Sequence, residues 1–305
     1  MQDMTRPVRV LGVPMDLGAD RRGVDMGPSA IRYAGLMRAV TETYRECTDS
    51  GDLAVPHPET VTQSDREIIG RAKYLDETQE TCAMVADSVA KSLEDAQLPL
   101  ILGGDHSIAI GSVNGAARAA DLGIVWFDAH GDFNTPGTSP SGNIHGMSLA
   151  ATLGIDGFAE TDWSNAMVDP KNVALVGVRA LDDQESTAIG NSSVTVYTMS
   201  DIDDQGVPDV VGEALRIATD GTDGVHISLD MDVVDPNEAP GVGTPVRGGM
   251  TYREAHAAME RVADLGDRLR TMEVVEVNPI LDEHNQTAEL AVELVASALG
   301  KRILY

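Results

Sequence analysis

Short apolar runs alternate along this chain with longer segments in which apolar residues recur at helical spacing. We predict strands at the apolar runs, which are 7–13, 98–102, 123–128, 172–178, 193–198, 224–230 and 271–277. A further short strand is expected near 44–48. Most runs are apolar throughout rather than at every second position, a pattern typical of strands buried on both faces of a parallel sheet.

The segments between these runs predict helices over 29–40, 65–96, 107–119, 209–219, 251–264 and 285–299. The last helix but one has a clear start signal, because Thr251 and Glu254 have the spacing of a capping box. The alternation predicts an α/β fold, a three-layer α/β/α sandwich with a mainly parallel sheet, in a single domain over 1–305. The Gly-, Pro- and Ser-rich segment 134–146 is expected to be an active-site loop.

The chain is strongly acidic, with a formal net charge of -27 from 22 basic and 49 acidic residues among 305. This charge argues against binding to nucleic acid or to an anionic membrane surface, because both would repel it. No apolar stretch is long enough to span a membrane, and residues 1–6 do not resemble a signal sequence. We therefore expect a cytoplasmic protein that binds neither nucleic acid nor membrane.

The acidic residues are spread along the chain, and the basic residues that oppose them include only four lysines. Mutual repulsion among so many acids weakens as ionic strength rises. We therefore hypothesise that the protein is halophilic, adapted to a salt-rich cytoplasm. An ordinary acidic protein is the alternative.

Acids and histidines follow four of the predicted strands directly. GGDHS follows 98–102, DAHGD includes the end of 123–128, DMDVVDP begins at the end of 224–230, and Glu276 lies near the end of 271–277. Ligands of open α/β sheets bind beyond the carboxyl ends of the strands. These side chains are therefore expected to gather at one edge of the sheet.

Six of these side chains have the atoms and spacing of metal ligands, namely His106, Asp128, His130, Asp132, Asp230 and Asp232. Those at alternate positions share a face of an extended strand. Packed carboxylates repel one another unless cations are present, and this set fits two ions with bridging carboxylates better than one. Oxygen and imidazole ligands without thiolate favour Mn²⁺, with Fe²⁺ or Co²⁺ as alternatives. Such a two-metal site can present hydroxide at neutral pH.

Taken together, the motifs resemble those of the ureohydrolases, and within them the arginase family. The resemblance rests on GGDHS (103–107), DAHGDFNTP (128–136), SGNIHGM (141–147), SLDMDVVDP (228–236), EVNP (276–279), GVDMGPSAIR (23–32) and APGVGTPVRGG (239–249). These segments cover essentially the whole chain in the expected order and spacing.

The resemblance implies a parallel sheet of about eight strands and a centre of two Mn²⁺ ions per subunit. It implies hydrolysis of L-arginine to L-ornithine and urea by a hydroxide that bridges the two ions. One ion would be held by His106, Asp128, Asp132 and Asp230, and the other by His130, Asp128, Asp230 and Asp232. A homo-oligomer, either a trimer or a hexamer, is also implied.

The resemblance assigns further roles around the metals. Asp132 would orient the hydroxide, Glu276 would accept hydrogen bonds from the cationic guanidinium, and His145 would carry a proton to the leaving amine. The substrate carboxylate would meet Asn134, Ser139 and Ser141, and its ammonium would meet Asp182 and Glu185. Two alternatives stay open: an agmatinase or other guanidino-compound ureohydrolase, and a metal-binding regulatory or scaffold protein without turnover.

Overall fold

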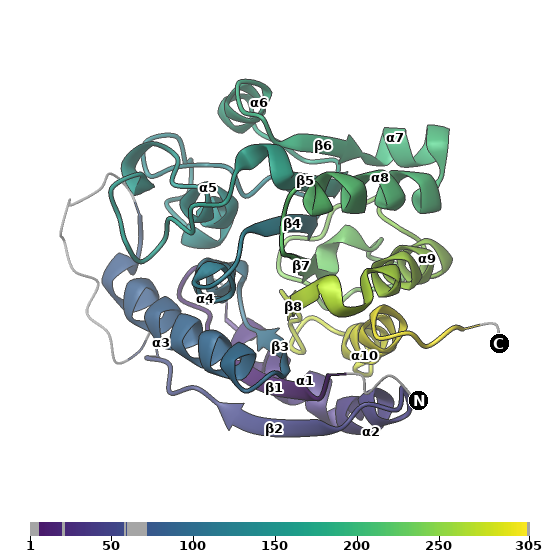
Figure 1. Cartoon of the computed structure of the whole chain (residues 1–305). Coiled ribbons are helices and arrows are strands. Elements are labelled where there is room, and N and C mark those ends of the chain that lie inside the picture. Colours follow the sequence, from purple (N-terminus) through teal and green to yellow (C-terminus); the bar gives the residue numbers. More distant parts are fainter. Residues whose placement is uncertain (1–5, 20–21, 58, 60–71, 304–305) are drawn as a thin grey trace.

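The computed structural model describes residues 6–19, 22–57, 59 and 72–303 of the chain. Its centre is a sheet of eight strands in the order β2-β1-β3-β8-β7-β4-β5-β6, with all neighbours parallel (Figure 1). The strands are β1 Val8–Val13, β2 Cys47–Asp52, β3 Leu98–Gly103, β4 Leu122–Phe127, β5 Val173–Val178, β6 Thr195–Thr198, β7 Gly224–Asp230 and β8 Leu269–Val275. The predicted parallel sheet is confirmed.

Helices cover both faces of this sheet (Figure 1). They are α1 Gly27–Tyr33, α2 Leu36–Thr41, α3 Leu75–Glu94, α4 Ala109–Ala117, α5 Ser148–Thr152, α6 Asp183–Gly190, α7 Met199–Gln205, α8 Val207–Thr219, α9 Tyr252–Val262 and α10 Gln286–Ala298. One face carries α3, α4 and α5, and the other carries α8, α9 and α10 with the short α1 and α2. The predicted three-layer architecture is therefore confirmed.

Several helix boundaries differ from the prediction. The helix expected over 29–40 is two helices, because Gly35 has φ 95° and ends the first of them. Within the described residues α3 begins only at Leu75, and 65–71 lies outside them. The short helices α5, α6 and α7 were not predicted, since they are too short to show an apolar stripe. The capping box at the start of α9 is confirmed.

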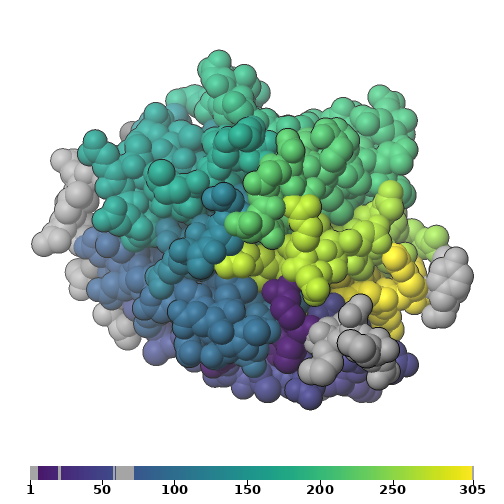
Figure 2. Space-filling model, in the orientation of Figure 1, coloured from purple at the N-terminus to yellow at the C-terminus, as the bar shows by residue number. Residues whose placement is uncertain are grey.

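The sheet brings together strands that are far apart in the sequence. β3, β8, β7 and β4 are consecutive neighbours in it. In the space-filling view, the blue segment around α3 and α4 lies beside the yellow-green segment around β8 (Figure 2). The carboxyl ends of these four strands therefore meet at one edge. None of the described helices is long and apolar enough to cross a membrane.

Candidate metal centre

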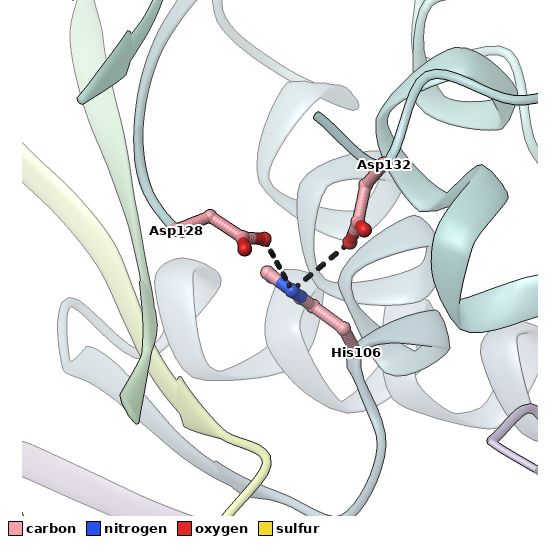
Figure 3. Close-up of side chains that lie close together, drawn as sticks. All are labelled: His106, Asp128 and Asp132. Atoms are coloured by element: carbon pink, nitrogen blue, oxygen red, sulfur yellow. Dashed lines mark ion pairs between the residues drawn. The ribbon is translucent and has the colours of Figure 1, made fainter. Parts of the chain in front are cut away.

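Three carboxylates from different motifs surround one ring nitrogen of His106. Its Nδ1 lies 3.2 Å from Asp128 Oδ2 and 3.1 Å from Asp132 Oδ2 (Figure 3). Asp230 Oδ2 lies 3.1 Å from the same nitrogen. All four side chains are buried, so this cluster is removed from bulk water.

A second group of ligand atoms adjoins the first and shares one carboxylate with it. Nδ1 of His130 lies 3.0 Å from Asp232 Oδ2 and 3.4 Å from Asp128 Oδ1. The ligand atoms of His106, Asp128 and Asp132 form one set close enough to hold an ion, and those of Asp128, His130 and Asp232 form another. The shared Asp128 makes these two adjacent positions rather than two separate sites.

The same local turn builds each of the three motifs after β3, β4 and β7. In each, an aspartate accepts a hydrogen bond from the backbone N–H two residues further along. Asp105 accepts from Ser107 (3.0 Å), Asp128 from His130 (2.7 Å), and Asp230 from Asp232 (2.8 Å). This short polar turn is what aspartate favours where a strand ends, and it fixes the direction of the histidine or aspartate within it.

The buried charges perturb one another strongly. Burial and the charge of Asp128 raise the pKa of Asp132 to about 6. Burial lowers the pKa of His130, but hydrogen bonds and charges from Asp128 and Asp232 outweigh it and raise that pKa to about 12. Without ions, the cluster thus depends on protonated histidines to balance its carboxylates.

Two atoms of the cluster are buried without a hydrogen bond. His106 Nδ1 and Asp132 Oδ2 lie 3.1 Å apart but have no hydrogen-bond partner among the described residues. A buried polar atom left in this way is costly unless another ligand satisfies it. Carboxylate and imidazole atoms aimed at a common point, with no thiolate, fit a pair of divalent cations.

The backbone at two site residues adopts a left-handed conformation that only glycine adopts easily. Asp132 has φ 49° and Glu276 has φ 64°. Such strain persists only where surrounding contacts impose it, and here Glu276 N donates to Gly104 O at 2.8 Å. The strain therefore marks two positions at which the direction of the side chain is kept at the expense of a relaxed backbone conformation.

The partly buried His145 and the buried Glu276 form a pair beside the first metal position. Glu276 Oε1 lies 3.1 Å from His145 Nδ1 and accepts a hydrogen bond from His106 N at 3.0 Å. Burial lowers the pKa of His145, but the hydrogen bond and charge of Glu276 outweigh it and raise that pKa to about 9. His145 is therefore a cation at neutral pH in this arrangement.

A cavity of about 360 Å³ opens beside these residues. Among the described residues, those that line it include His106, His130, Asp132, His145, Asn134, Asp182, Glu185, Asp230 and Thr244. Glu276 is not among the lining residues, because it lies behind His145 and His106. The cavity joins the candidate metal positions to a second group of polar residues.

That second group contains three of the residues expected to bind the amino-acid end of a substrate. Asn134 Nδ2 donates to Asp182 Oδ2 at 2.8 Å. Asp182 also caps α6, and Glu185 from the first turn of α6 accepts a hydrogen bond from Phe133 N at 2.9 Å. Burial raises the pKa of Glu185 to about 7. The cavity thus has metal-binding side chains on one side and an amide with two acids on another.

The other two residues expected there lie elsewhere in the loop. Ser139 Oγ accepts a hydrogen bond from Gly142 N at 2.9 Å, and Ser141 Oγ accepts one from Asn143 N at 3.1 Å. Neither serine is among the described residues that line the cavity. In this conformation both hydroxyls hold the fold of their own loop.

Two residues at the site were not identified from the sequence. Thr244 lines the cavity and donates to Asp232 Oδ2 at 3.0 Å. Trp126 stacks on His106 with ring centroids 4.2 Å apart and donates to Asp128 Oδ2 at 3.0 Å. Trp126 lies in β4 two residues before Asp128, and this spacing was the available signal for the second, because alternate residues of an extended segment share a face.

Comparisons with known proteins agree with this geometry. The "Arginase family" profile matches residues 6–300. An arginase of Bacillus caldovelox is 46% identical over 98% of this chain and 100% of its own length. One of Bacillus subtilis is 48% identical over 99% and 100%. The solved structure of the Bacillus caldovelox arginase superposes with a TM-score of 0.92 at 45% identity, covering 98% of this chain and 100% of that one.

Proposed function

Because the chain belongs to the arginase family and is a ureohydrolase of the arginase type, we propose that its cavity binds L-arginine and releases L-ornithine and urea. One observation carries the proposal. Two groups of metal-binding atoms share Asp128 and face a cavity that also contains an amide and two acids. That layout suits a substrate with a guanidinium at one end and an α-amino acid at the other.

We assign the two metal positions as the family resemblance suggests. The first would use His106, Asp128, Asp132 and Asp230, and the second His130, Asp128, Asp230 and Asp232. Mn²⁺ is the proposed metal, because the donors are carboxylates and imidazoles. When bound, two such ions supply Lewis acidity and make hydroxide available at neutral pH.

Glu276 is the proposed partner of the guanidinium. His106 N donates to its carboxylate at 3.0 Å. Burial raises the pKa of Glu276, but the hydrogen bond and charge of His145 outweigh burial, so that pKa lies below the ordinary value. An entering guanidinium can replace His145 as the hydrogen-bond partner of this anion, in a charge-assisted pair. The exchange would also release the His145 ring toward the cavity that it lines.

His145 and Asp132 are the proposed proton-handling residues. The His145 imidazolium carries a proton that it can donate at Nδ1 or Nε2 to the departing amine of ornithine. Asp132 lines the cavity and would accept a hydrogen bond from the attacking water, which orients the water toward the guanidinium carbon. Before substrate enters, the contact with Glu276 favours the protonated state of His145 that this role requires.

The amino-acid end of the substrate is assigned to the far side of the cavity. Asp182 and Glu185 would pair with the ammonium, and Asn134 would donate to the carboxylate, assisted by Ser139 and Ser141 through their loop. Agmatine lacks that carboxylate, so these contacts are what would favour L-arginine. An agmatinase-type activity is the alternative.

A reconstitution assay tests the proposal. Chelated protein is reloaded with Mn²⁺, and urea release is measured with L-arginine and with agmatine. We expect turnover only with metal, a clear preference for L-arginine, and loss of activity in Asp128→Asn. Preference for agmatine would support the alternative. Metal-independent turnover, or full activity in Asp128→Asn, would contradict the assigned centre.

The quaternary structure and cellular location also remain proposals. A homo-oligomer, a trimer or a hexamer, is proposed from the family resemblance, and light scattering of the purified protein would test it. A cytoplasmic location stays a prediction from the sequence.

A further inference from the structure

A row of buried polar side chains extends from the back of His106 into the sheet. With Nδ1 facing the metal cluster, the other ring nitrogen of His106, Nε2, lies 2.7 Å from Ser228 Oγ. Ser228 donates to Glu273 Oε1 at 2.8 Å. His226 Nε2 lies 3.2 Å from the same oxygen, and its Nδ1 lies 2.6 Å from Thr271 Oγ1. All these side chains are buried, so the row lies within the apolar layer between the sheet and α4.

The register of the central strands creates this row. β7 and β8 pair His226 with Thr271 and Ser228 with Glu273. Alternate residues of a strand share a face, so the two pairs point to the same side of the sheet, as does Asp230 at the end of β7. A shift of one residue would turn all of them to the opposite face.

Glu273 is a fully buried carboxylate that neither lines the cavity nor belongs to the proposed metal ligands. Such a group is tolerated only if its oxygens are hydrogen-bonded, and both are: Ser228 and His226 contact Oε1, and Ser112 of α4 donates to Oε2. Burial raises the pKa of Glu273, but the charge and hydrogen bond of His226 outweigh it, and the pKa lies below the ordinary value. An anion is thus held two hydrogen bonds behind His106.

The ring of His106 is fixed from two directions. Trp126 stacks on its face at an interplanar angle of 15°, which sets the plane of the ring. Ser228 contacts its Nε2, which sets the rotation within that plane. A metal-bound histidine commonly hydrogen-bonds through its second nitrogen in this way, and the bond fixes the tautomer.

We propose that Ser228 and Glu273 are positioning residues that set the metal affinity of the position containing His106, an inference that rests on the proposed function. Ser228 accepts the Nε2 proton of His106, which leaves Nδ1 as the ligand atom, and Glu273 holds the serine hydroxyl in that orientation. The other position is built differently. His130 is 29% exposed, and no described residue hydrogen-bonds its Nε2. The effect therefore falls on one of the two positions.

Two serines provide a matched experiment. Ser228 and Ser112 are both fully buried, and each donates to Glu273, but to opposite oxygens. Ser228→Ala breaks the connection to His106, whereas Ser112→Ala removes a comparable hydrogen bond on the side away from it. Mn²⁺ binding to chelated wild type and both variants is measured by calorimetry, and the metal-free proteins are unfolded thermally for comparison.

We expect wild type to bind two Mn²⁺ ions. Ser228→Ala should weaken one of the two by about 10- to 100-fold and leave the other unchanged, the usual effect of losing a partner behind a metal ligand. Ser112→Ala should lower the unfolding midpoint of the metal-free protein by a similar amount to Ser228→Ala, yet bind both ions as wild type does.

Two results would overturn the inference while leaving the proposed function intact. One is unchanged Mn²⁺ binding in Ser228→Ala. The other is an equal loss of Mn²⁺ affinity in Ser112→Ala, which would mean that the affinity depends on the packing of the core in general. Wild type that binds no Mn²⁺ would contradict the proposed function and this inference with it.

Discussion

The pair formed by His145 and Glu276 stabilises the metal-free protein by an amount that can be worked out from the structure. The pKa of His145 is raised from 6.5 to about 9, because Glu276 outweighs the effect of burial. The His145 side chain is only 18% exposed, so solvent screens the pair little. At 1.36 kcal/mol per pKa unit, the shift corresponds to about 3 kcal/mol.

The sign follows from which state binds the proton more tightly. Because the folded pKa lies above the unfolded one, the stabilisation is complete below about pH 6.5 and is lost as the pH rises through about 9. His145→Ala removes it. In EDTA, the free energy of unfolding of wild type should exceed that of the variant by about 3 kcal/mol more near pH 6 than near pH 10.

Urea denaturation of both proteins across this pH range measures the difference directly. His256→Gln is a suitable control, since burial lowers the pKa of His256 and its contribution therefore changes only below about pH 6.5, with the opposite sign. If the curves for wild type and His145→Ala run parallel between pH 6.5 and 9, the reasoning about this pair is refuted.

Four other expectations concern metal, substrate, salt and backbone. Mn²⁺ at about 100 times its dissociation constant should add about 2.7 kcal/mol per ion to the free energy of unfolding, and an unchanged thermal midpoint would contradict a metal centre. Asn134→Ala should raise the KM for L-arginine more than that for agmatine in urea-release assays, and equal effects would remove Asn134 from carboxylate recognition. Raising KCl from low to molar concentration should raise the unfolding midpoint, and a flat or falling midpoint would end the halophilic hypothesis. Gly104→Ala should abolish Mn²⁺ binding, because the new Cβ would lie 1.8 Å from Met15 O, and calorimetry showing normal binding would contradict this.

The interior strands of the sheet could be predicted because a strand buried on both faces is apolar at nearly every position. β4, LGIVWF, is buried at every position and was predicted within one residue at each end. β2, CTDSGD, lies at the edge and is mostly exposed, so its sequence carries little apolar signal. The prediction there gave only a short strand near 44–48, whereas the strand is Cys47–Asp52.

Candidate ligands were predictable for a different reason, which is that each motif is local. Asp128 and His130 lie within one turn after one strand, so chain order alone places them together. Contacts between residues on different strands give no such signal in the sequence. Glu273 meets Ser228 only because of the pairing register of β7 and β8, 45 residues apart in the chain. Ser139 illustrates a further gap, since the sequence does not say whether a loop hydroxyl faces a cavity or its own backbone.

The position of β8 has a consequence for how the protein is made. It is the last strand in the chain, yet it lies between β3 and β7 and pairs with both. Before it inserts, His106 follows a strand on one half of the sheet, while Asp128 and Asp230 belong to the other. The first ion position is therefore complete only once β8 has paired between β3 and β7, and we expect metal loading to follow this long-range pairing.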